Sequence, residues 1–235
     1  MTGPSHIQRQ LTLNIQLRDD ATFDNFSASA AQQALLRALQ IQQDESGEPM
    51  IYVYGPADSG KSHLLQAACH LAGNTVLYLP LAELIDNAPD EVLHSMESMR
   101  LVCLDDVDAV LGNEDWELAL FHFFNRARQT GCRLLFSGIA APRALSVDLP
   151  DLRSRLSWGV VFQLEEASDE TKRDILCFRA ARRGLQMPPE VASYIISHAS
   201  RGLGNLLQLL GQLDAASLTE KRSLSIPFVK EQLGW

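Results

Sequence analysis

The sequence predicts an α/β fold, in which a parallel sheet is flanked by helices and followed by a small α-helical lid. Apolar, β-rich runs alternate with helix-like stretches up to about residue 166, which is typical of a parallel sheet covered on both faces. A glycine-rich segment follows the first of these runs, and only helical patterns remain beyond residue 167. These observations together indicate a phosphate-binding α/β domain with a helical appendage.

The predicted elements follow the chain in that order. We expect an extended arm over residues 1–18, a nucleotide-binding α/β domain over 19–166 and a helical lid over 167–235. Within the α/β domain, a helix with an apolar stripe is expected near 29–43, and strands at 50–55, 75–81, 100–107 and 133–139. In the lid, Ser168 and the pair Pro188-Pro189 are helix start signals, and a further helix is expected near 203–218.

The composition is that of an acidic globular protein. The 235 residues are 46% hydrophobic and carry a formal net charge of −9. Clustered Lys and Arg provide most of the affinity for phosphate backbones, so this charge argues against direct, sequence-specific DNA binding. The four cysteines are far apart and are expected to be reduced. No signal core or membrane-spanning run is present, so we expect a cytoplasmic protein without membrane contact.

The glycine-rich segment reads GPADSGKS and matches the phosphate-loop pattern G-x-x-x-x-G-K-S. Its backbone N–H groups are expected to surround the phosphates, with Lys61 reaching the terminal phosphate and the Ser62 hydroxyl holding Mg²⁺. His63 follows directly and is counted with the site, although His63 and His70 also fit a role as packing residues. The expected loop ligands are Gly55, Pro56, Asp58, Ser59, Gly60, Lys61 and Ser62.

Two adjacent carboxylates follow the apolar run near residue 101. Asp105 stands at the end of this strand, where a carboxylate can bind Mg²⁺, and Asp106 could orient an attacking water. A plain strand-ending turn is the alternative explanation. Asp108 is interpreted as a solvated turn residue.

Several segments resemble the DnaA/Hda family of P-loop AAA+ proteins. ATFDNF (21–26), GPADSGKSHLL and LVCLDDVDAV look like parts of the DnaA ATPase domain, and DLRSRLSWGVVFQLEEASDETKRDIL (151–176) resembles its arginine-finger region. The resemblance covers roughly residues 20–220. A basic helix-turn-helix domain is not expected, because the sequence ends at Trp235 just after the lid helices.

The arm contains a second resemblance. Gln10, Leu11, Leu13 and Ile15 fit the Q-L-x-L-x-[L/I] peptides that dock in the groove of the β sliding clamp, as extended recognition segments do. An N-terminal edge strand is the alternative. With a DnaA-like core, the arm resembles the Hda branch of the family.

The resemblance implies a mechanism in trans. Members of the Hda branch sit on the clamp and stimulate hydrolysis of DnaA-bound ATP, which makes them negative regulators of replication initiation. The implied arginine finger is Arg155, expected to be exposed, and Arg153 is the second candidate. For Arg153, a solvated surface arginine is the preferred explanation.

Two departures from the family pattern concern the protein's own nucleotide. Ile139 stands where the initiator has an acidic residue, which leaves Ser137 as a weaker polar sensor. Gly204 stands where the lid arginine would be, and Arg201 is the nearest substitute. We therefore expect weak intrinsic hydrolysis and a bound ADP, although another nucleoside diphosphate or ATP is compatible.

Some alternatives remain open from the sequence. Phe23 and Phe26 could contact the base or pack in the core. An autonomous AAA+ ATPase, such as a helicase loader or clamp-loader component, is the competing function, while the charge opposes a DNA-binding initiator fragment. Homo-oligomerisation is also left open.

Overall fold

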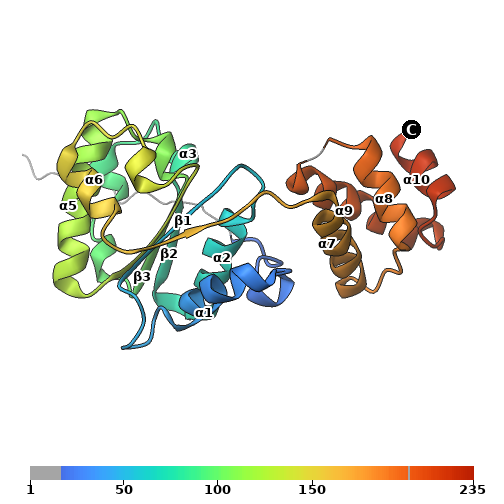
Figure 1. The fold of residues 1–235 in the computed structure, drawn as a ribbon, viewed down its shortest axis with the longest axis horizontal. Coiled ribbons are helices and arrows are strands. Elements are labelled where there is room, and N and C mark those ends of the chain that lie inside the picture. Colours follow the sequence, from blue (N-terminus) through green and yellow to red (C-terminus); the bar gives the residue numbers. More distant parts are fainter. Residues whose placement is uncertain (1–16, 201) are drawn as a thin grey trace, which may run out of the picture.

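The computed structural model describes residues 17–200 and 202–235 and contains an α/β domain followed by a helical lid (Figure 1). The predicted arm residues Gln10, Leu11, Leu13 and Ile15, and the predicted sensor Arg201, therefore lie outside the described residues. No described helix has both the length and the apolar character needed to cross a bilayer.

Within residues 17–200 and 202–235, five parallel strands form the sheet, in the order β2-β3-β4-β1-β5. Their bounds are β1 Met50–Tyr54, β2 Val76–Pro80, β3 Leu101–Asp105, β4 Arg133–Gly138 and β5 Val160–Gln163. The four strands expected from the apolar runs are confirmed. The fifth, β5, is an edge strand in which half-buried and exposed residues alternate; its apolar run, Val160 to Phe162, is only three residues long and was not predicted as a strand.

Helices cover both faces of the sheet (Figure 1). One face packs against α1 (Gln33–Ile41) and α2 (Lys61–Ala72), and the other against α5 (Glu114–Thr130) and α6 (Pro150–Leu156), with the short helices α3 (Leu81–Leu84) and α4 (Pro89–Val92) alongside. Each fully buried large apolar side chain in these layers contributes roughly 1.5–3 kcal/mol.

The buried carboxylate of Glu117 attaches α6 to α5. Glu117 is 1% exposed and accepts backbone hydrogen bonds from Gly112 (2.9 Å), Asp148 (3.1 Å) and Leu149 (2.6 Å). Leu149 is the N-cap residue of α6. Because all three N–H groups depend on one side chain, Glu117 fixes where α6 begins relative to α5.

The described residues of the lid form four helices, α7 Asp169–Arg182, α8 Pro189–His198, α9 Leu203–Glu220 and α10 Ile226–Leu233. Ser168 caps α7 by accepting from the backbone N–H of Thr171 at 3.1 Å, and Pro189 opens α8, as predicted. The helix α10 was not predicted, because its eight residues are too few to show a clear helical period. The lid has its own core, which includes Leu176, Ile195, Leu210 and Phe228.

Candidate nucleotide site

The phosphate loop connects the end of β1 to the first turn of α2, as the motif predicts. Gly60 has φ +95°, and a Cβ there would lie 2.9 Å from Cε2 of Phe26. A Cβ at Gly55 would lie 2.2 Å from the carbonyl oxygen of Leu164. Only glycine therefore fits either position. The loop places the N-terminus of α2 where backbone N–H groups can face a phosphate.

Lys61 is held by the loop itself. Its Nζ donates to the carbonyl oxygens of Gly55 and Pro56, both at 2.9 Å, and the residue is 7% exposed. Gly55 and Pro56 thus orient the ammonium group and do not line the cavity. The Ser59 hydroxyl is buried and has no hydrogen-bond partner within the described residues. An unpaired hydroxyl in this loop fits a phosphate oxygen as its partner.

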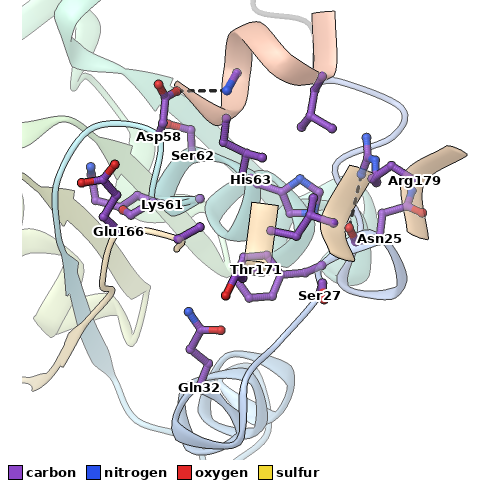
Figure 2. Close-up of a pocket in the computed structure, with 18 of the residues that line it drawn as sticks. Asn25, Ser27, Gln32, Asp58, Lys61, Ser62, His63, Glu166, Thr171 and Arg179 are labelled. Carbon is purple, nitrogen blue, oxygen red and sulfur yellow. Dashed lines mark hydrogen bonds between the residues drawn. The ribbon is translucent and has the colours of Figure 1, made fainter. Parts of the chain in front are cut away.

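A cavity of about 340 Å³ lies between the phosphate loop, the segment before α1 and the lid (Figure 2). Its volume is within the range of small-molecule sites. The predicted site residues that line it are Phe26, Asp58, Ser59, Gly60, Lys61, Ser62, His63 and Gly204. Phe23 and Ser137 do not line it, since Phe23 packs against the core under α2 and Ser137 is fully buried. Phe23 therefore has the packing role, whereas Phe26 both packs and faces the cavity.

A segment before α1, here called the strap (residues 18–26), is fastened to α2 by two histidines. His63 Nε2 lies 2.8 Å from the carbonyl oxygen of Thr22, and His70 Nε2 lies 2.9 Å from that of Arg18. Burial lowers the pKa of His63 despite its bond to Thr22, so the neutral ring donates from Nε2. His70 is exposed and His63 lines the cavity, so the packing interpretation of the two histidines stays a prediction. No group of three or more His, Cys, Asp or Glu side chains that could hold a metal occurs among the described residues.

The lid contributes an arginine that the sequence analysis missed. Arg179 on α7 is 4% exposed, forms a salt bridge with Asp20 and donates to the carbonyl oxygens of Asp20 and Asn25, both at 3.3 Å (Figure 2). Burial alone would raise the pKa of Asp20, but Arg18 and Arg179 lower it. Nothing in the helical pattern of α7 distinguishes Arg179 from its neighbouring arginines, because its partners come from the other end of the chain.

The N-terminus of α9 rests on the phosphate loop. The backbone N–H of Gly204 donates to Asp58 Oδ1 at 3.4 Å, where the carboxylate also faces the positive end of the helix (Figure 2). A Cβ at Gly202 would lie 2.5 Å from Asp58 Oδ2, and one at Gly204 would lie 3.0 Å from Oδ1. Gly204, which stands where the family resemblance places the lid arginine, is thus a position where α9 approaches Asp58 too closely for a larger side chain.

The predicted magnesium ligand Asp105 does not face the cavity. It is 1% exposed, and its two oxygens accept hydrogen bonds from Tyr78 Oη (2.6 Å) and Ser137 Oγ. Asp106 is half-buried, and burial followed by the charge of Asp105 raises its pKa. Of the predicted metal ligands, Ser62 alone lines the cavity. Ser62 and Asp105 as arranged do not fit the expected magnesium site, because the Asp105 carboxylate is buried outside the cavity and accepts hydrogen bonds from two hydroxyl groups.

The loop after β4 departs from prediction in one respect. Ile139 is 59% exposed, and its backbone N–H donates to Asp108 Oδ1 at 2.8 Å. Asp108 is therefore more than a solvated turn residue, since its carboxylate holds the loop that carries Ile139.

Arg155 is half-buried and is paired with a side chain of its own chain, contrary to the expectation that it is exposed. Its Nε donates to Asn125 Oδ1 at 3.2 Å, and its guanidinium carbon lies 5.3 Å from the ring centroid of Phe121 and 5.9 Å from that of Phe124. The cause is the aromatic surface of α5, on which a guanidinium group stacks favourably. Within the described residues its Nη atoms have no hydrogen-bond partner. Arg153 is exposed and donates to the carbonyl of Val147.

The position of α6 separates Arg155 from the protein's own cavity. Helix α6 packs with α5 on one face of the sheet, while the helix that follows the phosphate loop, α2, lies on the other face. The five-stranded parallel sheet, the phosphate loop and the helical lid beside it define an AAA+ P-loop protein.

Comparisons with known proteins identify the family. The family model for the bacterial DnaA ATPase domain matches residues 17–163, and the one for the Hda lid domain matches 169–233. An uncharacterized protein of Haemophilus influenzae is 41% identical over 231 residues, which cover 97% of this chain and 99% of that protein. The chain belongs to the DnaA/Hda family of AAA+ proteins, and its lid is of the Hda type.

Solved structures show the same fold. Domain III of the Thermotoga maritima replication initiation protein DnaA matches with a TM-score of 0.77 at 22% identity, over 94% of this chain and 98% of that one. AMPPCP-bound DnaA from Aquifex aeolicus matches with a TM-score of 0.68 at 22% identity, over 88% of this chain and 69% of that one. Together with the Hda-type lid, this fold supports a DnaA-related regulator of replication.

Proposed function

We propose that this protein restrains replication initiation by docking on the β sliding clamp and stimulating hydrolysis of DnaA-bound ATP. The observation that carries the proposal is the placement of Arg155. It lies on the sheet face away from α2, which supports a role toward another protein's nucleotide and not its own. An arginine finger supplied in trans accelerates phosphoryl transfer by about 10³–10⁵.

The contacts of Arg155 suit that role. Asn125 and the rings of Phe121 and Phe124 hold the guanidinium from one side, through Nε and the π faces. The Nη edge is then available to a γ-phosphate oxygen. A guanidinium fixed before the partner arrives loses less conformational entropy on docking than a free surface arginine. Partial burial therefore supports the finger proposal for Arg155 over Arg153.

We further propose that the protein's own cavity holds ADP. Lys61, the unpaired Ser59 hydroxyl and the N-terminus of α2 provide a phosphate site, and Phe26 offers an apolar surface beside it. Ile139 and Gly204 replace the polar groups that would act on a γ-phosphate. Intrinsic ATP hydrolysis is accordingly weak in this proposal, and the nucleotide mainly keeps the lid and the α/β domain together.

The clamp-binding role rests on the arm sequence. Gln10, Leu11, Leu13 and Ile15 match the clamp-binding pattern. The strap that continues the arm is fastened to α2, where the backbone N–H of Arg18 donates to Gln66 Oε1 at 2.9 Å. An arm that starts from a fixed point can dock as a tether without reorganising the α/β domain.

The test is the rate of ATP hydrolysis by purified DnaA with DNA-loaded clamp. Wild-type protein is compared with Arg155→Ala, with Gln10→Ala/Leu11→Ala, and with Arg37→Ala, an exposed arginine on α1 that serves as the matched control. We expect stimulation by wild type and the control only. If Arg153→Ala loses stimulation of DnaA and Arg155→Ala retains it, the finger is assigned to Arg153 instead of Arg155. Absence of stimulation, with rapid hydrolysis by this chain alone, would establish the autonomous ATPase.

A further inference from the structure

The carboxylate of Asp105 is satisfied by the protein itself. Tyr78 on β2 donates to Oδ2 at 2.6 Å, and Ser137 on β4 donates to Oδ1. These two strands flank β3 in the sheet, so the three groups are assembled by strand order and register. All three residues are buried, with exposures of 1% for Asp105, 9% for Tyr78 and 0% for Ser137.

This arrangement is unfavourable for a magnesium ligand. Mg²⁺ requires near-octahedral oxygen ligation and keeps several of its waters, so it needs a carboxylate with an accessible oxygen. Here both oxygens already accept hydrogen bonds, which are strong because the acceptor is charged. Each carboxylate oxygen can accept more than one hydrogen bond, but Asp105 is 1% exposed and does not line the cavity, so binding a metal there would require the side chain to leave its buried position between the two hydroxyl groups.

The hydroxyl groups of Tyr78 and Ser137 are held in their orientations toward Asp105 by their surroundings. Tyr78 is 9% exposed, so its hydroxyl has little access to water as an alternative acceptor. The Ser137 hydroxyl also accepts from the backbone N–H of Asp106 at 2.9 Å, which orients its own proton toward Asp105. Rotation of Ser137 would break two hydrogen bonds at once.

The cavity has other means of holding phosphates. Arg18, Lys61 and Arg179 line it, and the buried Ser59 hydroxyl has no hydrogen-bond partner within the described residues. Asp58, Glu165 and Glu166 also line the cavity, and Arg18 and Arg179 both pair with Asp20. The groups available to a diphosphate are therefore mainly Lys61, the Ser59 hydroxyl and the backbone N–H groups at the N-terminus of α2.

We infer that this site binds its nucleoside diphosphate with little dependence on Mg²⁺, because Tyr78 and Ser137 withhold Asp105 from the metal. The inference rests on the nucleotide-binding half of the proposed function and is independent of the clamp and of Arg155. Tyr78 is thereby a positioning residue that acts through Asp105.

The experiment is calorimetric titration of the full-length protein with ADP, in MgCl₂ and in EDTA. For wild type, the two dissociation constants agree within about threefold. In Tyr78→Phe, one oxygen of Asp105 is released, and Mg²⁺ strengthens ADP binding by about tenfold or more. Tyr54→Phe is the matched control, because its hydroxyl contacts Gln163 at the edge of the sheet and leaves Asp105 untouched.

The outcomes separate the inference from the proposed function. A tenfold loss of wild-type affinity in EDTA, or a Tyr78→Phe variant that is as indifferent to Mg²⁺ as wild type, overturns the inference and leaves the ADP site intact. Absence of ADP binding in both media overturns both. Thermal unfolding verifies that each variant is folded, and Ser137→Ala, which frees the other oxygen, replaces Tyr78→Phe if that variant is not.

Discussion

Replacing Glu117 tests how the finger helix is positioned. Its carboxylate is the acceptor for three backbone N–H groups, two at Oε1 from Gly112 and Asp148 and one at Oε2 from Leu149. Glu117→Ala removes all three acceptors at a site where the carboxylate is 1% exposed. Of the residues that then lose their anchor, Asp148 and Leu149 lie directly before α6, the helix that carries Arg155, and Gly112 lies just before α5.

The magnitude follows from those bonds. Each buried N–H left without an acceptor costs about 1–3 kcal/mol, and removing the carboxylate recovers part of its own desolvation cost. We therefore expect Glu117→Ala to lower the free energy of unfolding by about 3–5 kcal/mol. Glu117→Gln retains an oxygen for Gly112 and Asp148 but places its NH₂ group against the N–H of Leu149, so a loss of about 2 kcal/mol is expected.

The assay is urea unfolding of the nucleotide-free protein, monitored by tryptophan fluorescence and circular dichroism. Gln129→Ala, an exposed substitution on the same helix, is the control and should remain within about 0.5 kcal/mol of wild type. If Glu117→Ala unfolds within 1 kcal/mol of wild type, or if Gln is no better tolerated than Ala, the anchoring role assigned to Glu117 is wrong.

Three further predictions concern the site. Asn125→Ala frees Arg155 and should lower maximal stimulation of DnaA about tenfold or more, with the half-saturating concentration and Tm nearly unchanged; an unaltered maximum would refute the positioning role. Because the pKa of His63 is lowered on folding, the protein gains stability above the unfolded value of about 6.5 and loses it as pH falls through the folded pKa. Tm measured from pH 7.5 to 5 should therefore fall less in His63→Gln than in wild type, whereas His94→Gln, at an exposed position, should follow wild type. Gly60→Ala adds a Cβ at φ +95°, should cost about 1–2 kcal/mol and should abolish ADP binding by calorimetry; retained affinity would contradict the loop geometry.

The sequence was sufficient for the parts of the fold that depend on local signals. Four strands, the phosphate loop and the helical lid follow from apolar runs, glycine positions and capping residues. The edge strand β5 and the short helix α10 were not predicted, because neither has a long periodic pattern. Burial of an edge strand is set by its neighbours, and those are known only once the strand order is known.

The site was less predictable because its decisive contacts join distant segments. Arg179 meets Asp20 across 159 positions of the chain, and Tyr78 meets Asp105 from a neighbouring strand. The local pattern identified Asp105 as an acid at a strand end but contained no information on which hydroxyl groups would face it. In the same way, Phe121 and Phe124 become a platform for Arg155 only after α6 packs on α5.

The strap links two events that occur at different places on the protein. Its backbone accepts from His63 and His70 on one side and from Arg179 of the lid on the other, while Asn25 and Phe26 border the cavity. A ligand that tightens these contacts and a load that pulls on the chain before Leu17 act on the same few hydrogen bonds. Thermodynamic reciprocity then requires that, if tension on the chain weakens nucleotide binding by some free energy, bound nucleotide opposes the tension-induced change by the same free energy.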